Sequence, residues 1–316
     1  MTDILKNSGL IVALPHENDY VAGTTSPLKP EFKTWDWVPY LPSEERQSSK
    51  VFDALACVSF SALNCLEAQL NWYLANNKLP ETTKRFLYEN GYIVDEKVNL
   101  SDRFLAKASG TTKNGNYLQK VADTLRHFGA VPEHLWAWDK ETFDWNAYYG
   151  EIPGEVKEQG LRFLEHFDIS YQWLFGAGYD DYLQYAPIQT ALYTCPGWNN
   201  PPVEWCGATT SNHAVMKYDN YTIFDTYEPF NKVLSGAYEI PWRMQIIITP
   251  KKLTFMKLVI KGTEQYLEDS AGRHWHIYNA ASLTALLDAG VINTLTPTPV
   301  ETINDTGKEF VVLVRE

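Results

Sequence analysis

The chain has 316 residues, of which 45% are hydrophobic and 21% are charged. This composition can fill a substantial core, which argues against intrinsic disorder, and the length suits one large domain or two modest ones. The 27 Lys and Arg residues against 39 Asp and Glu residues give a net charge of −12, which argues against nucleic acid or an anionic membrane as partner. Residues 1–9 lack the basic and apolar regions of a secretory signal, and no apolar run could span a bilayer, so we expect a cytoplasmic protein or a component of a viral particle.

Residues 1–45 are predicted to form an extended N-terminal segment, because they are rich in polar residues and interrupted by prolines. Trp35, Trp37 and Tyr40 are expected to fix the end of this segment on the body of the protein. Two interpretations remain open at this point. The segment is either a packed N-terminal arm, or a pro-segment or regulatory flap.

Four helices are predicted before residue 168. The clearest covers residues 54–75, where apolar residues recur every three or four positions without Pro or Gly. Cys57 is therefore expected in the first turn of a long, buried helix. The other three helices are expected at residues 81–89, 117–128 and 154–167.

Segments rich in β-branched and aromatic residues follow residue 168 and predict strands. They cover residues 169–175, 188–193, 213–218, 221–225 and 244–248. An order of helices first and strands later favours the α+β class over an alternating parallel sheet.

Residues 251–316 are predicted to form a small β-rich C-terminal domain. Its expected elements are strands at 255–260, 266–268 and 310–314, a turn at 269–272 and a short helix at 281–287. A unit of this size cannot carry a large core alone, so we expect it to dock on the main body or on a protein partner. His274 and His276 have the spacing of a metal-binding pair but no third ligand nearby, so no metal is expected.

Cys57 has three polar residues elsewhere in the sequence that suit a reactive site. A helix N-terminus stabilises negative charge, which favours the thiolate form of a cysteine. His213 begins one predicted strand, and Asp225 ends the next, where it could accept a hydrogen bond from the imidazole. Gln47 precedes the cysteine and could donate a hydrogen bond to an oxyanion. The set suits acyl transfer, whereas the alternative is that the cysteine and histidine are structural.

Several segments resemble those of papain-like cysteine peptidases, in the order in which that family has them. Residues 57–62, Cys-Val-Ser-Phe-Ser-Ala, resemble the start of the active-site helix, where the family has Cys-Trp-Ala-Phe-Ser. Other similar segments are Leu-Ser-Asp-Arg-Phe-Leu at 100–105, the glycine-containing stretch at 110–118, the helix at 122–129, the strand at 186–192, Asn-His-Ala-Val at 212–215 and the strand at 223–227. The resemblance covers roughly residues 45–250.

This resemblance implies a two-lobed fold over residues 46–250, with a helical lobe and an antiparallel β lobe. It implies that Cys57 is the nucleophile, His213 the base and Asp225 the residue that orients the base, with no cofactor. Gln47 would then donate to the oxyanion. The substrate-binding residues that it implies are Gly115, which would pair with substrate backbone, Asn116 and Asn212.

The sequence departs from the family at two of these positions. Gln47 lies ten residues before Cys57, whereas the family's glutamine lies about six before its cysteine, so a loop insertion at 48–52 is expected to absorb the difference. Asp225 stands where the family has Asn, and its oxygen can accept the same hydrogen bond from the imidazole.

The remaining cysteines are not expected to react with substrate. Cys65 follows Cys57 on the same helix and is predicted to lie in the core. The family's usual disulfides are missing, and Cys195 and Cys206 either bridge one loop or are both free thiols. The missing secretory signal favours free thiols.

The favoured function is a cysteine peptidase that hydrolyses peptide bonds through a thioester acyl-enzyme, with a peptide or protein as substrate. A second hypothesis is a catalytically silent papain-like module that binds within a larger assembly, such as a viral particle. A third is amidase or transglutaminase chemistry, because those enzymes share the Cys, His and Asp order.

Overall fold

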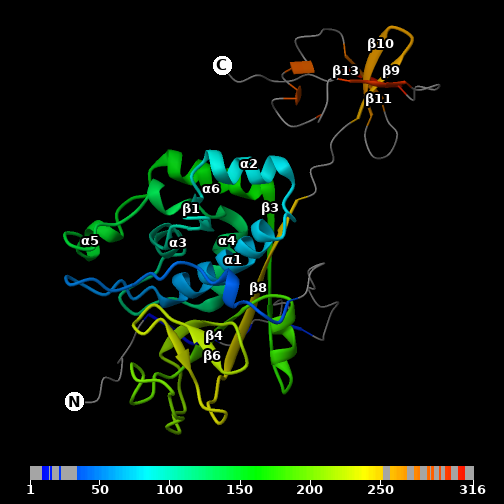
Figure 1. Ribbon diagram of the computed structural model, residues 1–316. Helices are drawn as coiled ribbons and strands as arrows, with labels where there is room; N and C mark the ends of the chain where they lie inside the picture. The colour runs from blue at the N-terminus through cyan, green and yellow to red at the C-terminus, as the bar shows by residue number, and fades with distance from the viewer. Residues whose placement is uncertain are drawn as a thin grey trace. The chain divides into compact units, whose positions relative to one another are not determined.

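The computed structural model describes residues 34–251 continuously, together with 9–13, 15 and 21–22. Beyond residue 251 it describes 257–268, 274–277, 283–284, 286–287, 292, 296–299 and 305–309. The chain divides into two compact units, Met1–Lys251 and Lys252–Glu316 (Figure 1). None of the helices in these described ranges combines the length and the apolar character needed to cross a membrane.

The first unit begins with its helices. They are α1 (Cys57–Ala75), α2 (Glu81–Glu89), α3 (Asp102–Ala108), α4 (Leu118–Phe128), α5 (Trp145–Tyr148) and α6 (Gly154–His166), with the 3₁₀ turns η1 (Val38–Tyr40), η2 (Glu133–Leu135) and η3 (Tyr179–Gln184). A short hairpin of β1 (Ile93–Val94) and β2 (Lys97–Val98) lies among them. The predicted helix at 54–75 begins later, at Cys57, because Leu55 has a φ of 52° and Ala56 is not helical. Cys57 is therefore its first residue.

A six-stranded antiparallel sheet follows, in the order β3-β8-β4-β5-β6-β7. Its strands are β3 (Phe167–Trp173), β4 (Ile188–Leu192), β5 (His213–Lys217), β6 (Thr222–Phe224), β7 (Asn231–Val233) and β8 (Trp242–Pro250). The α+β class is confirmed. The sequence did not predict β7, because its Asn-Lys-Val segment is polar and places a lysine at the buried position.

Helix α1 is buried on all sides, which fits its apolar composition. It contacts α3 and α4 as well as strands β4, β5 and β8 (Figure 1). The Gln69 side chain fixes it to β8: Nε2 donates to the carbonyl of Ile246 at 2.9 Å, and Oε1 accepts from the amide of Ile248 at 3.2 Å. This packing places the N-terminus of α1 against the sheet.

The second unit contains a mixed five-stranded sheet in the order β12-β9-β10-β11-β13. Its strands are β9 (Lys257–Lys261), β10 (Glu264–Glu268), β11 (His274–Ile277), β12 (Thr298–Pro299) and β13 (Asp305–Glu309). Of the predicted helix at 281–287, residues 283–284 and 286–287 are helical. The predicted turn at 269–272 and the predicted strand at 310–314 lie outside the described residues.

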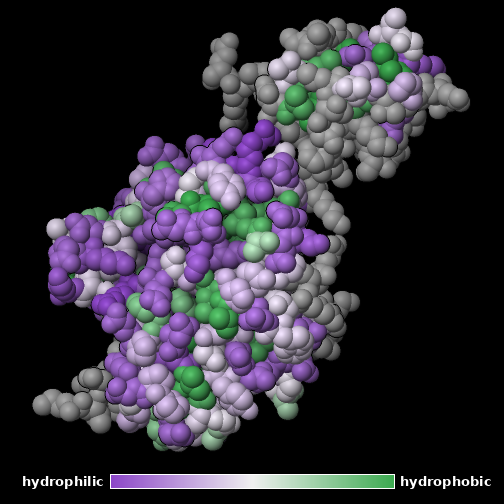
Figure 2. All heavy atoms as spheres, in the orientation of Figure 1, coloured by the Kyte–Doolittle hydropathy of each residue, from purple (hydrophilic) through white to green (hydrophobic). Residues whose placement is uncertain are grey.

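The surface of the first unit on the face drawn in Figure 2 is mostly hydrophilic, with hydrophobic residues in small separate patches. Scattered apolar residues of this kind are normal on a soluble surface. This face therefore offers no reason to propose a docking surface.

Candidate active site

Cys57 and His213 meet where α1 and β5 begin. Both residues are fully buried, and their side chains are hydrogen-bonded to each other. They are 156 positions apart in the sequence, and the packing of α1 on β5 brings them together. The backbone amides of the first helical turn also lie at this end of α1, where partial positive charge favours an anion.

His213 is bonded on its other side to Asp225, just after β6. The distance from Nε2 of the imidazole to Oδ1 of the carboxylate is 2.6 Å, and both side chains are fully buried. Burial by itself would lower the pKa of His213, but the charge and hydrogen bond of Asp225, together with Cys57, raise it to about 10. Three predicted residues thus form one continuous hydrogen-bonded chain.

Asp225 accepts hydrogen bonds on both of its oxygens. Oδ1 also accepts from the backbone amide of Thr226 at 2.7 Å, and Oδ2 accepts from Nε1 of Trp198 and from Nζ of Lys232, each at 2.8 Å. Burial tends to raise the pKa of Asp225, but the charges of His213 and Lys232 and their hydrogen bonds lower it to about 2. The carboxylate is therefore held in its ionised form.

Gln47 lies beside this group but its amide is engaged elsewhere. Its Nε2 donates to Oδ1 of Asp53 at 2.9 Å and to the hydroxyl of Tyr227 at 2.7 Å. Its Oε1 accepts from the hydroxyl of Thr226 at 3.0 Å. Both amide N–H groups thus have partners, and an oxyanion would have to replace one of them.

The predicted insertion between Gln47 and Cys57 forms a tight turn. The amide of Ser49 donates to the carbonyl of Phe52 at 2.9 Å, and the amide of Ala54 donates to the carbonyl of Gln47 at 3.0 Å. The longer spacing is therefore absorbed without moving Gln47 away from the site.

Two of the predicted substrate-binding residues use their side chains within the protein. Nδ2 of Asn116 donates to the hydroxyls of Ser109 and Thr111, and the side chain of Asn212 is bonded to Thr194 at the adjoining end of β4. Their side chains hold local backbone in place. The third, Gly115, has a φ of 94°, which its turn requires.

Residues 9–13 cover the segment that contains Gly115. The amide of Asn116 donates to the carbonyl of Gly9 at 2.9 Å, and the amide of Ile11 donates to the carbonyl of Asn116 at 2.8 Å. A Cβ on Gly115 would lie 2.1 Å from the Gly9 carbonyl oxygen, and a Cβ on Gly9 would lie 1.8 Å from the carbonyl oxygen of Leu55. The N-terminal segment thus runs in direct contact with the backbone two residues before Cys57.

Leu10 anchors this segment in a buried position. Its side chain is 6% exposed and lines a small cavity together with Leu118, Trp173, Ala191 and Trp242. The neighbouring Val12, in contrast, is 42% exposed. Burial therefore falls from Leu10 to Val12, and Leu10 is the anchoring side chain of the two.

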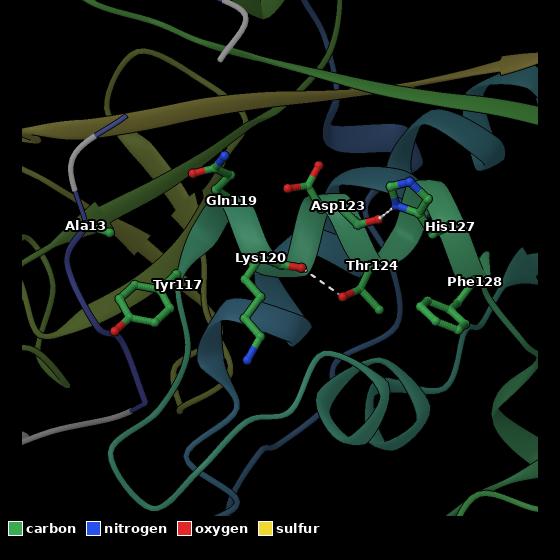
Figure 3. Close-up of a pocket in the computed structure, with 8 residues that line it drawn as sticks. All are labelled: Ala13, Tyr117, Gln119, Lys120, Asp123, Thr124, His127 and Phe128. Atoms are coloured by element: carbon green, nitrogen blue, oxygen red, sulfur yellow. Dashed lines mark hydrogen bonds between the residues drawn. The ribbon is translucent and has the colours of Figure 1, made fainter. Parts of the chain in front are cut away.

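A groove of about 420 Å³ continues from this cavity along α4 (Figure 3). It runs from Ala13 and Tyr117 to His127 and Phe128 at the end of the helix. Two of its polar side chains are bonded within α4: the imidazole of His127 to the carbonyl of Asp123, and the hydroxyl of Thr124 to the carbonyl of Lys120. The groove is thus an extension of the surface on which residues 9–13 lie.

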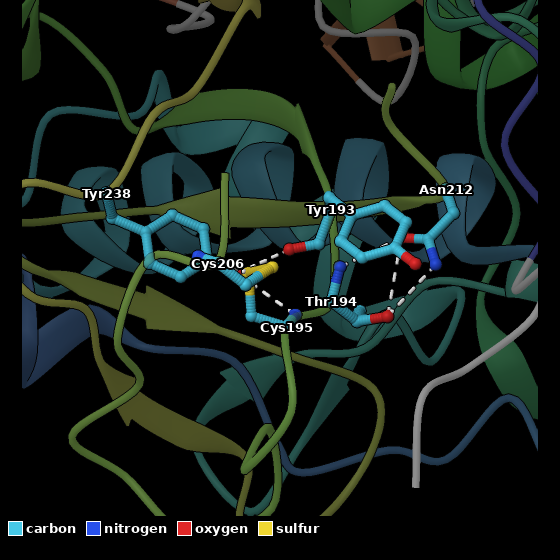
Figure 4. The surroundings of a disulfide bond; sticks show 6 residues. All are labelled: Tyr193, Thr194, Cys195, Cys206, Asn212 and Tyr238. Atoms are coloured by element: carbon cyan, nitrogen blue, oxygen red, sulfur yellow. Dashed lines mark hydrogen bonds between the residues drawn. A yellow bond between two sulfur atoms is a disulfide. The ribbon is translucent and has the colours of Figure 1, made fainter. Parts of the chain in front are cut away.

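Cys195 and Cys206 form a disulfide, so the expectation of free thiols was wrong (Figure 4). The loop between β4 and β5 brings their Cα atoms to 5.7 Å, which is within the range for a disulfide. The expectation failed because the conformation of this loop, which the N-terminal sequence does not report on, brings the two sulfurs together. Trp198 lies inside the closed loop and bonds to Asp225.

The variant Cys195→Ala/Cys206→Ala is expected to lower the free energy of unfolding by about 2–3 kcal/mol, because the disulfide closes a loop of 11 residues in the unfolded chain. Denaturant unfolding under non-reducing conditions measures the change. An unchanged unfolding midpoint would show that the disulfide does not stabilise the fold.

A metal centre has no support in the part of the chain that the structure describes. No group of three or more His, Cys, Asp or Glu residues there is arranged to hold an ion. His274 is paired instead with Glu268, at 3.3 Å between Nε2 and Oε2.

No protein-family model matches the chain, and no curated protein matches its sequence. The solved structure of xylellain, a cysteine protease from Xylella fastidiosa, aligns with 79% of this chain and 98% of its own, at a TM-score of 0.51 and 14% identity. The fold is papain-like.

Weaker alignments exist with two other structures. Digestive procathepsin L 3 of the Tenebrio molitor larval midgut aligns over 75% of this chain and 71% of its own, at 17% identity and a TM-score of 0.41. The bromelain protease from Ananas comosus, in complex with the E64 inhibitor, aligns over 69% and 96%, at 14% identity and a TM-score of 0.42. The papain-like fold predicted from the resemblance is confirmed, and the xylellain alignment carries that conclusion.

Two residues at the centre of this papain-like fold were not predicted from the sequence. Trp198 and Lys232 both donate to Asp225, one from the disulfide loop and one from β7. The second follows Asp225 by seven positions, but the sequence predicted no strand there that would turn it inward. The first had no comparable signal, because aromatic residues are common in this chain.

Proposed function

We propose that the protein is a cysteine peptidase in which Cys57 is the nucleophile, His213 the general acid and base, and Asp225 the residue that orients His213. The observation that carries this proposal is the buried hydrogen-bonded chain from Cys57 through His213 to Asp225. An inert packing role would not require an imidazole bonded to both a thiol and a carboxylate. The structural similarity to xylellain, a cysteine protease, is consistent with it.

The chemistry follows from the positions of these groups. The Cys57 thiolate attacks the carbonyl carbon of a peptide bond, and the imidazolium of His213 protonates the departing amine, which leaves a thioester. His213 then accepts a proton from water as the water attacks the thioester, and the thiolate leaves. Asp225 holds the imidazole in the required tautomer throughout.

The developing oxyanion needs hydrogen-bond donors. The backbone N–H of Cys57 is one donor in this proposal, and Gln47 is the other. Because the N–H groups of Gln47 are bonded to Asp53 and Tyr227, substrate would have to displace one of these partners. Gln47 therefore changes partners in our proposal when substrate binds.

Residues 9–13 are proposed to exclude substrate from the site. Their backbone is bonded to Asn116, next to the Gly115 position that the family resemblance assigns to substrate. A peptide could occupy those backbone groups only after this segment has moved. Of the two interpretations of the N-terminal segment, this proposal favours a pro-segment or regulatory flap over a packed arm.

A thiol-directed epoxide, followed by mass spectrometry of the digested protein, tests the proposal. We expect Cys57 to be labelled selectively over Cys65, because only Cys57 is bonded to an imidazole that can take up its proton. His213→Ala is expected to slow this labelling by about ten-fold or more. Equal labelling of the two cysteines, or labelling that His213→Ala leaves unchanged, would contradict the proposal and favour a silent module.

A panel of peptides and primary amides, assayed with and without an added amine, separates peptidase from amidase or transglutaminase chemistry. Peptide hydrolysis without amine incorporation is expected. Incorporation of the amine would favour the transferase.

A further inference from the structure

The buried carboxylate of Asp225 costs more free energy of desolvation than a neutral hydrogen-bond acceptor would at the same position. Its carboxylate is fully buried, and removal of a carboxylate from water is costly unless a charge partner and hydrogen bonds compensate. His213 compensates the charge only while the imidazole is protonated. In the proposed reaction His213 gives up its proton to the leaving amine, and at that step Asp225 would lose its partner.

Lys232 supplies a second charged partner: burial lowers the pKa of its ammonium, and the charge and hydrogen bond of Asp225 oppose that effect. It is the middle residue of β7, between the exposed Asn231 and Val233, so the strand alternation directs its side chain inward. The side chain is fully buried, and Nζ lies 2.8 Å from Oδ2 of Asp225. The other two contacts of the ammonium are the carbonyls of Tyr227 at 2.5 Å and Pro229 at 2.6 Å. All three of its protons therefore have acceptors.

We propose that Lys232 is a positioning residue that neutralises Asp225, so that the buried carboxylate keeps a charge partner at the step where His213 gives up its proton. This inference rests on the proposed function. The imidazole and the ammonium occupy different oxygens of the carboxylate, so both partners bind at once. Asp225 and Lys232 together have no net charge. In electrostatic terms, the pair resembles the neutral asparagine that stands at this position in the family that the sequence resembles.

The charges around the site agree with this role. Asp225 and Cys57 both favour the protonated imidazole, whereas an ammonium near the imidazole disfavours it. The other titratable groups close by are Tyr227, whose ring centre lies 5.4 Å from that of His213, and Asp53, which is bonded to the Tyr227 hydroxyl. Lys232 is bound to the carboxylate that exerts the larger of these effects and carries the opposite charge.

The test compares the full wild-type chain with Lys232→Met, Asp225→Asn and the double variant. Methionine keeps most of the apolar stem without the charge, and asparagine keeps the shape of aspartate. The first readout is the pH titration of the His213 ring by NMR, and the second is the pH dependence of Cys57 alkylation by iodoacetamide. Neither readout requires peptide hydrolysis, so a failure of this inference can be told apart from a failure of the proposed function.

Lys217→Met is the matched control, because Lys217 is also a buried lysine of the same sheet. Its Nζ is bonded to the carbonyls of Asp219 and Asn220 and lies 3.3 Å from Oδ1 of Asp180, away from Asp225. Lys217→Met should lower the free energy of unfolding without changing the pH at which His213 titrates. A merely structural role for Lys232 would give the same pattern as this control.

We expect Lys232→Met to move the His213 titration upward by about one pH unit or more, because it removes the cation that neutralises Asp225 and leaves the carboxylate charge to His213 alone. Asp225→Asn should move it downward, and the double variant should return close to the wild-type value. An unchanged titration in Lys232→Met, or a double variant that does not return, would overturn the proposal.

Whether the variants fold is a second test of the proposal. If Lys232→Met does not fold but the double variant does, the carboxylate requires the ammonium, which supports the proposal, and the double variant is then compared with Asp225→Asn. If the double variant is unfolded as well, the lysine is needed for a reason other than Asp225, and the proposal is wrong.

Discussion

Cys57→Ala is expected to reduce peptide hydrolysis by about 10⁴-fold or more, because no other group at the site can form the thioester. The change removes one sulfur atom from the first residue of α1 and breaks the hydrogen bond to His213. The hydrogen bond between His213 and Asp225 and the packing of α1 do not depend on it. The loss of activity should therefore occur in a folded protein, with kcat falling far more than KM rises.

Cys65→Ala is the matched control for this variant. Cys65 is the other free cysteine, lies on the same helix and is also fully buried, and burial raises the pKa of its thiol. Its loss should leave kcat unchanged and lower the free energy of unfolding by about 1–2 kcal/mol. Hydrolysis that survives in Cys57→Ala would assign the reaction to another residue and end the proposed mechanism.

Leu10→Asp is expected to raise the rate of Cys57 labelling and of hydrolysis by about ten- to a hundred-fold. Burial of a leucine side chain is worth about 1.5–3 kcal/mol, and a carboxylate in its place could not stay in the apolar cavity lined by Trp173 and Ala191. Residues 9–13 should then leave Asn116 and open the site to substrate. Stopped-flow labelling of the full chain measures the rate.

Val12→Asp provides the comparison, since it adds the same charge to the same segment at an exposed side chain. It should leave the labelling rate within about two-fold of wild type, because surface substitutions have small effects. If both variants behave like wild type, the segment does not control access. If both accelerate equally, charge on the segment matters and the buried anchor does not.

The sequence predicted the central part of the site because its signals were local. The apolar repeat of α1 placed Cys57 in a first helical turn, and β-branched segments placed His213 and Asp225 at strand ends. Their order in the chain matched a known family. The three residues needed no knowledge of long-range contacts to be found, although their meeting depends on such contacts.

The features that the sequence did not predict depend on packing between distant segments. Lys232 reads as an ordinary surface lysine until the alternation of β7 turns it inward. The engagement of Gln47 depends on Asp53 and Tyr227, which lie in two different loops. The disulfide depends on how one loop folds back on itself, and the number of cysteines gives no information on that.

The disulfide loop makes the protein sensitive to the choice of reducing agent. Cys206 is exposed, so a strong dithiol can reach the bond, and that bond closes the loop whose Trp198 donates to Asp225. Cys57, the proposed nucleophile, must in contrast be kept reduced to react at all. Purification and storage therefore need a mild reductant, which keeps the Cys57 thiol reduced and leaves the Cys195–Cys206 disulfide intact. An excess of reductant would break that disulfide and loosen the loop from which Trp198 donates to Asp225.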